Sequence, residues 1–312
     1  MPNQHLIPEW QNPEIFEINR QPARSSTISF PSLASAQAGK SPARQQSLDG
    51  KWDFHWAPKP ADRPAGFESP DFSPVDWQPI CVPGHWELQG YGVPIYAPSH
   101  MPPSLRKLNL PNIDPQDNPV GSYRHTFTIP EQWQNHEIYL RFEGVCSAYY
   151  VWLNGEFVGY AQDSMLPSEF YISPFLKQGE NLLAVQVYRF SDGSYLENQD
   201  MWFLSGIFRP VKILAFPPVF IQDVTLNSRF YDGFEQGDVV IDTRIHYHKQ
   251  DQTGQKGLQL TAFLAYAGEE LSRTATRFEM NPGQVLHFST SLSVNHPKLW
   301  SAEIPVLYDV YL

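Results

Sequence analysis

Large apolar and polar side chains alternate over many short stretches of the chain. In Lys51–Trp56, the side chains of Trp52, Phe54 and Trp56 fall on one side of an extended backbone. This period of two is typical of a half-buried strand. Similar stretches recur at Ser122–Ile129, Glu137–Phe142, Ala148–Leu153, Phe157–Ala161, Asn181–Tyr188 and Gly206–Phe216. Helical periodicity is weak throughout, so the pattern predicts an all-β protein.

Turn signals join these strands into antiparallel pairs. Asn154-Gly155 stands between two apolar stretches, and both residue types tolerate the positive φ angles of a tight hairpin. Phe216-Pro217-Pro218 ends the series and is interpreted as a short linker, because proline cannot donate to a strand ladder. We therefore predict a jelly-roll-like sandwich over residues 47–216.

A second β series follows the linker and predicts an immunoglobulin-like sandwich over residues 217–312. Its expected strands are Val219–Arg229, Gly237–His248, Gly257–Ala267, Ala275–Met280 and Val285–Val294. Such a sandwich needs about seven strands, and this series supplies five or six. Ile304–Leu312 looks like a strand that begins without a closing partner. The sequence therefore predicts an incomplete, truncated second sandwich, since an unpaired strand edge is a liability.

Residues 1–46 lack sustained apolar periodicity and are rich in Ser, Ala, Gln, Pro and Arg after Arg20. We interpret them as an extended N-terminal arm that lies on another part of the protein. The alternative is a disordered tail, and the only evidence against it is the presence of the aromatic residues Trp10, Phe16 and Phe30.

Composition and charge restrict the class of protein. Of the 312 residues, 41% are hydrophobic and 14% aromatic, which is enough for a sizeable core. The net charge of −11 argues against binding to nucleic acid or to an anionic membrane. Cys81 and Cys146 are the two cysteines, too few for a disulfide framework. No apolar run of about 18 residues and no secretory signal is present, so a cytoplasmic location is the expectation.

The acidic residues do not form a recognisable catalytic pair. A glycosidase needs two carboxylates about 5–10 Å apart. The candidate acids are Glu87, Asp163, Glu169, Asp192, Glu197 and Asp200. Their spacing fits turns and surfaces better than a catalytic dyad, so no catalytic residue is predicted in this chain.

Two loops combine groups suited to binding a sugar. Ser191–Trp202 mixes carboxylates, amides and aromatic rings, which hydrogen-bond hydroxyl groups and cover apolar sugar faces. Asp192 before Gly193 also fits an Asx-turn, in which the carboxylate hydrogen-bonds the nearby backbone instead of a ligand. Asn118 precedes Pro119, which favours an extended conformation that leaves the amide free to point outward. From these residues alone, a simple turn asparagine is the preferred interpretation.

At these blocks the sequence resembles the multidomain bacterial β-galactosidases of glycoside hydrolase family two. The matching blocks are Leu48–Trp52, Val82–Trp86, Gly90-Tyr91, Pro94–Tyr96, Asn118–Tyr123, Gly159–Ser164, Leu166–Phe170, Ser191–Arg209 and Asn295–Ser301. The resemblance implies a galactose-binding jelly roll and an immunoglobulin-like domain. It also implies a (β/α)₈ barrel with both catalytic glutamates, which is absent from this chain.

The resemblance further implies site residues and ions. Asn118 and Asp200 match residues that contact galactose, and Asp200 also matches a sodium ligand. Glu9, Asn12, Gln162 and Asp192 match the oxygen ligands of a peripheral magnesium site, where Glu9 replaces a shorter aspartate. The arm matches a segment that supports contacts between subunits of homo-oligomers.

Three functions remain open at this point. The first is the N-terminal portion of a retaining β-galactosidase that hydrolyses lactose and other β-galactosides, with the portion alone inactive. The second is a stand-alone carbohydrate-binding module. The third is an assembly subunit that complements a partner chain holding the barrel.

Overall fold

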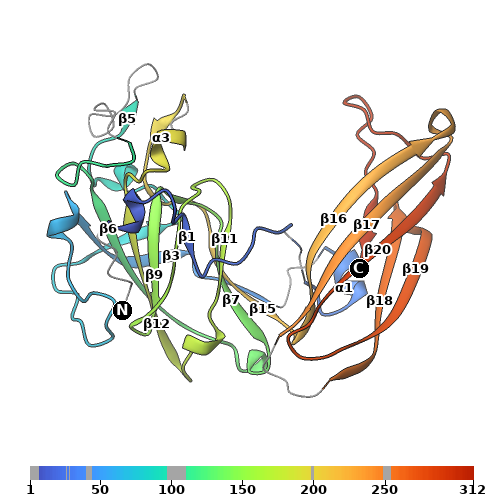
Figure 1. Ribbon diagram of the computed structural model, residues 1–312, viewed down its shortest axis with the longest axis horizontal. Helices are drawn as coiled ribbons and strands as arrows, with labels where there is room; N and C mark the ends of the chain where they lie inside the picture. The colour runs from blue at the N-terminus through green and yellow to red at the C-terminus, as the bar shows by residue number, and fades with distance from the viewer. Residues whose placement is uncertain are drawn as a thin grey trace. The chain divides into compact units, whose positions relative to one another are not determined.

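The computed structural model describes residues 7–25, 27, 29–39, 44–96, 110–197, 200–248 and 254–312. The chain divides into two compact units (Figure 1). Unit 1 comprises Met1–Ala23, Gln45–Gln134 and Ile138–Ala215, and unit 2 comprises Arg24–Arg44, Asn135–Glu137 and Phe216–Leu312. The residues of the predicted arm are thus shared between the two units, with the division after Ala23.

Unit 1 is built from short antiparallel strands joined by single turns of 3₁₀ helix. Its strands are β1 (Glu17–Ile18), β2 (Gln45–Ser47), β3 (Gly50–Ala57), β4 (Gln78–Val82), β5 (Ile95–Tyr96), β6 (Val120–Thr128), β7 (Glu137–Phe142), β8 (Val145–Cys146), β9 (Ala148–Leu153), β10 (Glu156–Ala161), β11 (Ser168–Tyr171), β12 (Glu180–Tyr188), β13 (Trp202–Phe203), β14 (Gly206–Ile207) and β15 (Val211–Phe216). Its helical turns are η1 (Glu9–Gln11), η2 (Pro60–Asp62), η3 (Glu87–Gln89), η4 (Glu131–Trp133), η5 (Ser173–Phe175) and α3 (Ser194–Glu197).

These strands form one large sheet, a facing smaller sheet and two short ribbons. The large sheet has the order β1-β10-β9-β12-β6-β3-β4, and the smaller one has the order β11-β7-β15-β2. The ribbons pair β13 with β5 and β14 with β8. The predicted all-β sugar-binding sandwich is confirmed.

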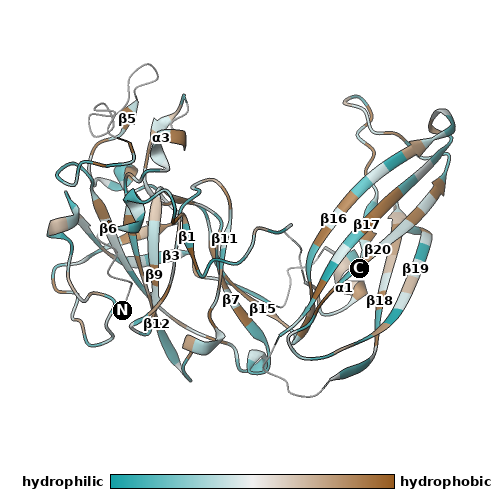
Figure 2. Ribbon diagram, in the orientation of Figure 1, coloured by the Kyte–Doolittle hydropathy of each residue, from teal (hydrophilic) through white to brown (hydrophobic). Residues whose placement is uncertain are grey.

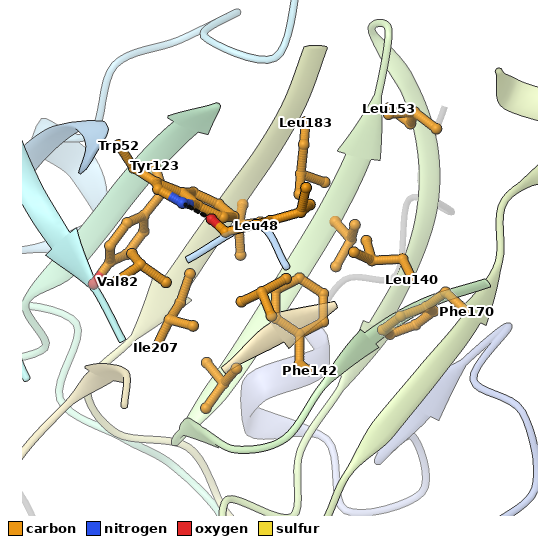
Figure 3. Packing of buried hydrophobic residues seen from close by; sticks show 14 of the residues in the cluster. Leu48, Trp52, Val82, Tyr123, Leu140, Phe142, Leu153, Phe170, Leu183 and Ile207 are labelled. Atoms are coloured by element: carbon orange, nitrogen blue, oxygen red, sulfur yellow. Dashed lines mark hydrogen bonds between the residues drawn. The ribbon is translucent and has the colours of Figure 1, made fainter. Parts of the chain in front are cut away.

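The central strands of the large sheet are covered on both faces, which explains their nearly continuous apolar sequence. Val151 and Leu153 of β9 point into the main core between the sheets, which also contains Trp52 and Phe142 (Figure 3). Trp52 donates its indole N–H to the Leu48 carbonyl at 2.8 Å. On the opposite face lies a second cluster that includes Tyr150, Tyr188 and Trp10. The ring of Trp10 stacks on Tyr188 at 5.3 Å, so the N-terminal segment covers the outer face of the sheet.

Unit 2 consists of two three-stranded sheets with longer strands. Its elements are α1 (Leu33–Gln37), β16 (Val219–Tyr231), η6 (Asp232–Phe234), β17 (Gln236–Tyr247), β18 (Gln255–Tyr266), β19 (Glu269–Met280), β20 (Val285–Asn295) and β21 (Asp309–Tyr311). The sheet orders are β16-β17-β20 and β19-β18-β21. Figure 2 shows apolar and polar residues alternating along β16 and β17, as expected of strands buried on one face. The immunoglobulin-like assignment is confirmed.

Several strand predictions need correction. The predicted strand Gly206–Phe216 is two strands, β14 and β15, because the chain leaves the ladder before Pro210. β19 begins at Glu269, six residues before the predicted start. The expectation that the last strand lacks a partner is wrong, since β21 pairs with β18 through Tyr311 and Phe263.

Candidate functional site

Asp200 contacts Tyr96 of β5, a strand that Figure 1 shows at one end of unit 1 together with α3. The side chain is exposed, and its Oδ1 accepts a hydrogen bond from the Tyr96 hydroxyl at 3.2 Å. Tyr96 and Trp202 are paired residues of the β5–β13 ribbon, with ring centroids 5.3 Å apart. About half of each residue is exposed, 51% of Tyr96 and 56% of Trp202. A carboxylate beside two exposed aromatic rings is an arrangement suited to a sugar.

Asn118 is fully buried, and its amide is occupied by the backbone of Phe190. Its Nδ2 donates to the Phe190 carbonyl at 3.0 Å, and its Oδ1 accepts from the Phe190 N–H at 2.8 Å. The expectation that this amide points outward is therefore wrong. The contacts show that Asn118 fixes the chain just after β12, and a direct contact with galactose stays a prediction.

A chain of contacts connects Asn118 with the Asp200 loop. Arg189 precedes Phe190, and its Nη2 donates to the carbonyls of Phe203 at 3.3 Å and Val93 at 2.8 Å. Phe203 lies in the same ribbon as Tyr96, which bonds Asp200. Both predicted sugar-binding residues thus belong to one contact network at one end of unit 1.

The four residues predicted to bind magnesium come from η1 with its C-cap and from two loops that the N-terminal segment contacts. The Asp192 N–H donates to the Trp10 carbonyl at 2.9 Å, and the Gln162 N–H donates to the Phe16 carbonyl at 3.0 Å. Glu9 and Asn12 lie at the start and the C-cap of η1. Backbone bonds therefore hold the N-terminal segment against the other two residues.

The side chains of Gln162, Asp192 and Glu9 are buried, and their remaining oxygens fit a hard cation. Gln162 Nε2 donates to Asp192 Oδ1 and to the Tyr160 hydroxyl, both at 2.7 Å, which leaves Gln162 Oε1 as an acceptor. A Cβ atom at Gly193 would lie 2.6 Å from that Oε1, so glycine keeps the space beside it open. Among the described residues neither Glu9 nor Asp192 forms an ion pair with a basic side chain.

The electrostatics of this cluster agree with that fit. Burial raises the pKa of the Asp192 carboxyl, although its bond with Gln162 opposes the shift. A buried carboxylate without a cationic partner is costly, and a divalent ion with oxygen ligands removes that cost. The oxygen donors of these residues are therefore of the kind that magnesium prefers. Asn12 is the least engaged, since its Oδ1 accepts only the Glu14 N–H at 3.2 Å among the described contacts.

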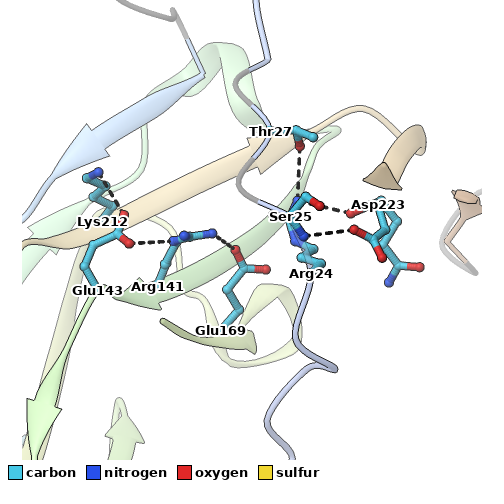
Figure 4. A network of polar contacts seen from close by, with 9 residues as sticks. Arg24, Ser25, Thr27, Arg141, Glu143, Glu169, Lys212 and Asp223 are labelled. Atoms are coloured by element: carbon cyan, nitrogen blue, oxygen red, sulfur yellow. Dashed lines mark hydrogen bonds and ion pairs between the residues drawn. The ribbon is translucent and has the colours of Figure 1, made fainter. Parts of the chain in front are cut away.

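Two of the other acids, Glu169 and Glu197, have structural partners. Glu169 pairs with Arg141 at 2.8 Å, and Arg141 also pairs with Glu143 at 3.1 Å (Figure 4). Glu197 accepts hydrogen bonds from the Ser164 N–H and hydroxyl at 3.1 and 2.6 Å. Within the described parts of the chain, no group of three or more His, Cys, Asp or Glu residues is placed to hold a metal. The same parts contain no helix that has the length and apolarity to cross a bilayer.

The sequence interpretation missed three residues that shape these sites. Tyr96 bonds Asp200, Tyr150 donates to Glu9 at 2.7 Å, and Arg189 joins the loops around Asp200. Tyr96 stood in a recognised block without an assigned role. Arg189 had one usable signal, a single arginine directly after the long apolar run of β12, where a charge needs a partner.

Comparison with known proteins gives matches along most of the chain. Residues 45–217 match the family described as "Glycosyl hydrolases family 2, sugar binding domain", and residues 219–312 match "Glycosyl hydrolases family 2". The chain is 38% identical over 309 residues to a β-galactosidase of Priestia megaterium, and 38% identical over 299 residues to one of Halalkalibacterium halodurans. These alignments cover 98% and 96% of the chain, but only 30% and 29% of the relatives' own length.

Solved structures show the same fold. A crystal structure of Bacteroides uniformis β-glucuronidase matches with a TM-score of 0.70 and 22% identity, over 86% of this chain and 30% of that one. A β-glycosidase from Bacteroides vulgatus matches with a TM-score of 0.62 and 22% identity. At such identities the likeness concerns the fold alone.

Proposed function

The chain belongs to glycosyl hydrolase family 2, and from this membership we propose that it is the N-terminal, sugar-binding portion of a retaining β-galactosidase. The observation that carries the proposal is the 38% identity with β-galactosidases along 98% of the chain. The chain spans about 30% of the length of those relatives. The general acid and the nucleophile would belong to the part of the relatives that this chain does not span.

The Asp200 end of unit 1 would form one wall of the galactose pocket. The carboxylate accepts hydrogen bonds from sugar hydroxyls, and the exposed face of Trp202 covers apolar C–H groups of the ring. Tyr96 keeps the carboxylate in one orientation through its 3.2 Å hydrogen bond. Asn118 supports the wall from behind, because it holds the backbone at Phe190.

Two ions would complete this portion. Asp200 would share a sodium ion with the sugar, and Glu9, Asn12, Gln162 and Asp192 would hold magnesium with their oxygen atoms. The positive charge of sodium would orient hydroxyl oxygens of the sugar. The positive charge of magnesium would join the N-terminal segment to the loops of Gln162 and Asp192. Contacts between subunits through the arm and a cytoplasmic location stay predictions of the sequence.

A chimera tests the proposed function. In it, this chain replaces the matching first part of the Priestia megaterium β-galactosidase. We expect the chimera to hydrolyse a chromogenic β-galactoside and lactose, whereas the chain alone should give no turnover. Turnover by the pure chain, or millimolar galactose binding by calorimetry without the rest of the enzyme, would instead favour a self-sufficient protein or a binding module. Activity regained on mixing the two pieces would favour a complementing subunit.

Asp200→Asn in the chimera tests the pocket wall. Loss of a hydrogen bond to a charged group costs about 1.5–3 kcal/mol, so kcat/KM should fall roughly 10- to 100-fold. Glu131→Gln is the matched control, since this exposed acid lies beyond the opposite end of β6 from Asn118. An unchanged kcat/KM in Asp200→Asn would remove Asp200 from the pocket.

Magnesium titration of the chain alone tests the second ion. Binding to the folded state should raise the midpoint of thermal unfolding. At a magnesium concentration 100 times Kd, the free energy of unfolding should increase by about 2.7 kcal/mol. Asp192→Asn should abolish the rise, and Asp163→Asn should not, because Asp163 follows Gln162 but pairs with Arg20 at 3.9 Å. A rise that persists in Asp192→Asn would place the ion elsewhere.

A further inference from the structure

A buried ion pair lies beneath the loops that carry Asp200. Glu87 begins η3, and Arg189 directly follows β12. The side chain of Glu87 is 0% exposed and that of Arg189 is 6% exposed. Arg189 Nε is 3.7 Å from Glu87 Oε1, which is too long for a hydrogen bond. The two groups therefore neutralise each other through space, while Arg189 Nη2 and Glu87 Oε2 form hydrogen bonds with other partners.

Arg189 reaches the backbone on both sides of the β5–β13 ribbon. Its Nη2 donates to the Val93 carbonyl at 2.8 Å, two residues before β5, and to the Phe203 carbonyl at 3.3 Å, within β13. This ribbon consists of only two residue pairs, Trp202 with Tyr96 and Phe203 with Ile95. So short a ribbon is not stable by itself. One guanidinium group thus joins the segment carrying Tyr96 to the segment carrying Trp202.

Glu87 holds the same loop at a second point. Its Oε2 accepts the Ser205 N–H at 2.8 Å, and the neighbouring Trp86 N–H donates to the Ser205 carbonyl at 3.1 Å. Ser205 lies five residues after Asp200. The pair therefore fixes the returning strand of the Asp200 loop at Phe203 and at Ser205.

The energetics do not favour a pair kept only for stability. Burying two charges carries a desolvation penalty that their attraction offsets only in part, so apolar residues of similar size often stabilise a core equally well. Burial lowers the pKa of Arg189 and raises that of Glu87, so in each residue burial disfavours the charged form. The hydrogen bonds of both residues go to backbone groups of the loops around Asp200, which indicates that the pair controls the conformation of these loops.

We propose that Arg189 and Glu87 are positioning residues, which clamp the loop 200–206 and the β5 segment so that the Asp200 carboxylate faces the sugar in one orientation. The inference rests on the proposed role of Asp200 in sugar binding. Neither residue touches the sugar in this account. They act through Phe203, Ser205 and Val93, and through the Tyr96 hydrogen bond to Asp200.

Three substitutions separate clamping from charge balance. Arg189→Met removes both the charge and the hydrogen bonds. Arg189→Lys keeps the charge, but its single ammonium replaces the planar fork that reaches two carbonyls. Glu87→Gln removes the negative charge and leaves an oxygen for the Ser205 N–H. The matched control is Glu169→Gln, which breaks another buried pair of unit 1, with side chains 7% exposed and 2.8 Å apart.

Hydrogen–deuterium exchange of the full chain gives a readout without catalysis. We expect exchange in peptides covering 93–96 and 200–206 to accelerate at least tenfold in Arg189→Met and in Arg189→Lys. Glu169→Gln should leave these peptides unchanged. In the chimera, displacement of the carboxylate by about 1 Å should lower kcat/KM on the order of 100-fold, mainly through kcat. The control should lower the unfolding midpoint without changing kcat or KM.

Each outcome has a distinct meaning. Unchanged exchange in Arg189→Lys, or full kcat/KM in that variant, would overturn the proposal and leave charge balance as the role of the pair. If Arg189→Met does not fold, Arg189→Lys alone decides. If the loops loosen as expected while Asp200→Asn retains full activity, the proposed sugar contact fails and the clamp stands. If Asp200→Asn loses activity while both Arg189 variants keep it, the positioning inference fails alone.

Discussion

Units 1 and 2 are both antiparallel β structures, yet they bury their side chains differently. In unit 1 every residue of β7 is buried, as are eight of the nine residues of β12. In unit 2 the thirteen-residue β16 has only two buried positions, and its second half is exposed throughout. Short strands covered on both faces give unit 1 a rigid frame with polar groups inside. Long strands covered on one face give unit 2 a thin core.

Unit 1 buries charged side chains and unit 2 keeps its polar contacts at a sheet edge, because the strands of unit 1 are covered on both faces and those of unit 2 on one. Unit 1 buries Arg141, Glu169, Arg189 and Glu87, and each has an oppositely charged neighbour, as Figure 4 shows for the first two. In unit 2, Arg24 and Ser25 attach at the edge of β16, where Ser25 N–H donates to Asp223 at 2.9 Å (Figure 4). A loop can be held accurately only over a frame that stays fixed, and the candidate sites all lie in unit 1.

The largest expected effect concerns the core of unit 1. Trp52→Ala should destabilise the protein by about 3–5 kcal/mol, because it removes a ring that is 1% exposed and leaves a cavity. Calorimetry of the whole chain should show a lower transition for unit 1 only. Leu292→Ala is the counterpart in unit 2, where the residue is also 1% exposed. If the calorimetric trace of either variant shows one transition at a lower temperature, the two units unfold together. The difference in burial between the units would then not produce a difference in their stability.

A smaller effect is expected at the hairpin of unit 1. Asn154 has φ of 55°, and its Nδ2 donates to Phe175 O and Asn181 Oδ1 at 2.8 and 2.9 Å. Asn154→Ala should cost about 1–3 kcal/mol, since it leaves buried partners unpaired and strains a left-handed backbone. Urea unfolding measures this loss. A loss below the error of the method would mean that water replaces the amide.

The equivalent hairpin of unit 2 offers the opposite change. Ala267-Gly268 joins β18 to β19, and Ala267 has φ of 51°, which favours asparagine over alanine. Ala267→Asn should therefore stabilise unit 2 by about 1 kcal/mol. The measurement is the same urea titration, followed by a probe in unit 2. Destabilisation would show that the turn is set by its flanking strands rather than by its own residues.

The smallest effect is a change in pH dependence within unit 1. Burial raises the pKa of the Glu197 carboxyl, so the folded state holds this proton more tightly than the unfolded state. Its contribution to stability is present at low pH and is lost as the pH rises through the raised pKa. Glu197→Gln cannot titrate, so its stability relative to the parent should increase from about pH 4 to about pH 8. A constant difference across this range would contradict the shift.

The strands of the chain were well predicted where burial alone sets the pattern. Glu137–Phe142 and Ala148–Leu153 have the predicted bounds, and the Asn154-Gly155 hairpin lies between β9 and β10. The prediction missed β4 and β11, whose short stretches contain Pro79 and polar residues. It also missed the Ala267-Gly268 turn, because alanine gives no signal for a positive φ.

The sites were predicted less evenly. Gln162 and Asp192 meet directly, as the resemblance implied, although they lie 30 residues apart. Asn118 is buried instead of outward-facing, because the Phe190 backbone takes both ends of its amide. No sequence pattern relates residue 118 to residue 190, so this pairing was beyond reach.

The sequence by itself determined the all-β class, most strand positions and the family, because alternation, turn residues and long ordered blocks are local properties. Only the tertiary structure decided which polar side chains have partners. Arg189 and Glu87 are 102 positions apart, and their contact with the Asp200 loop depends on how β12, η3 and β13 come together. Hydrogen bonds and buried charges act over a few ångströms in space, and that proximity is a property of the folded chain.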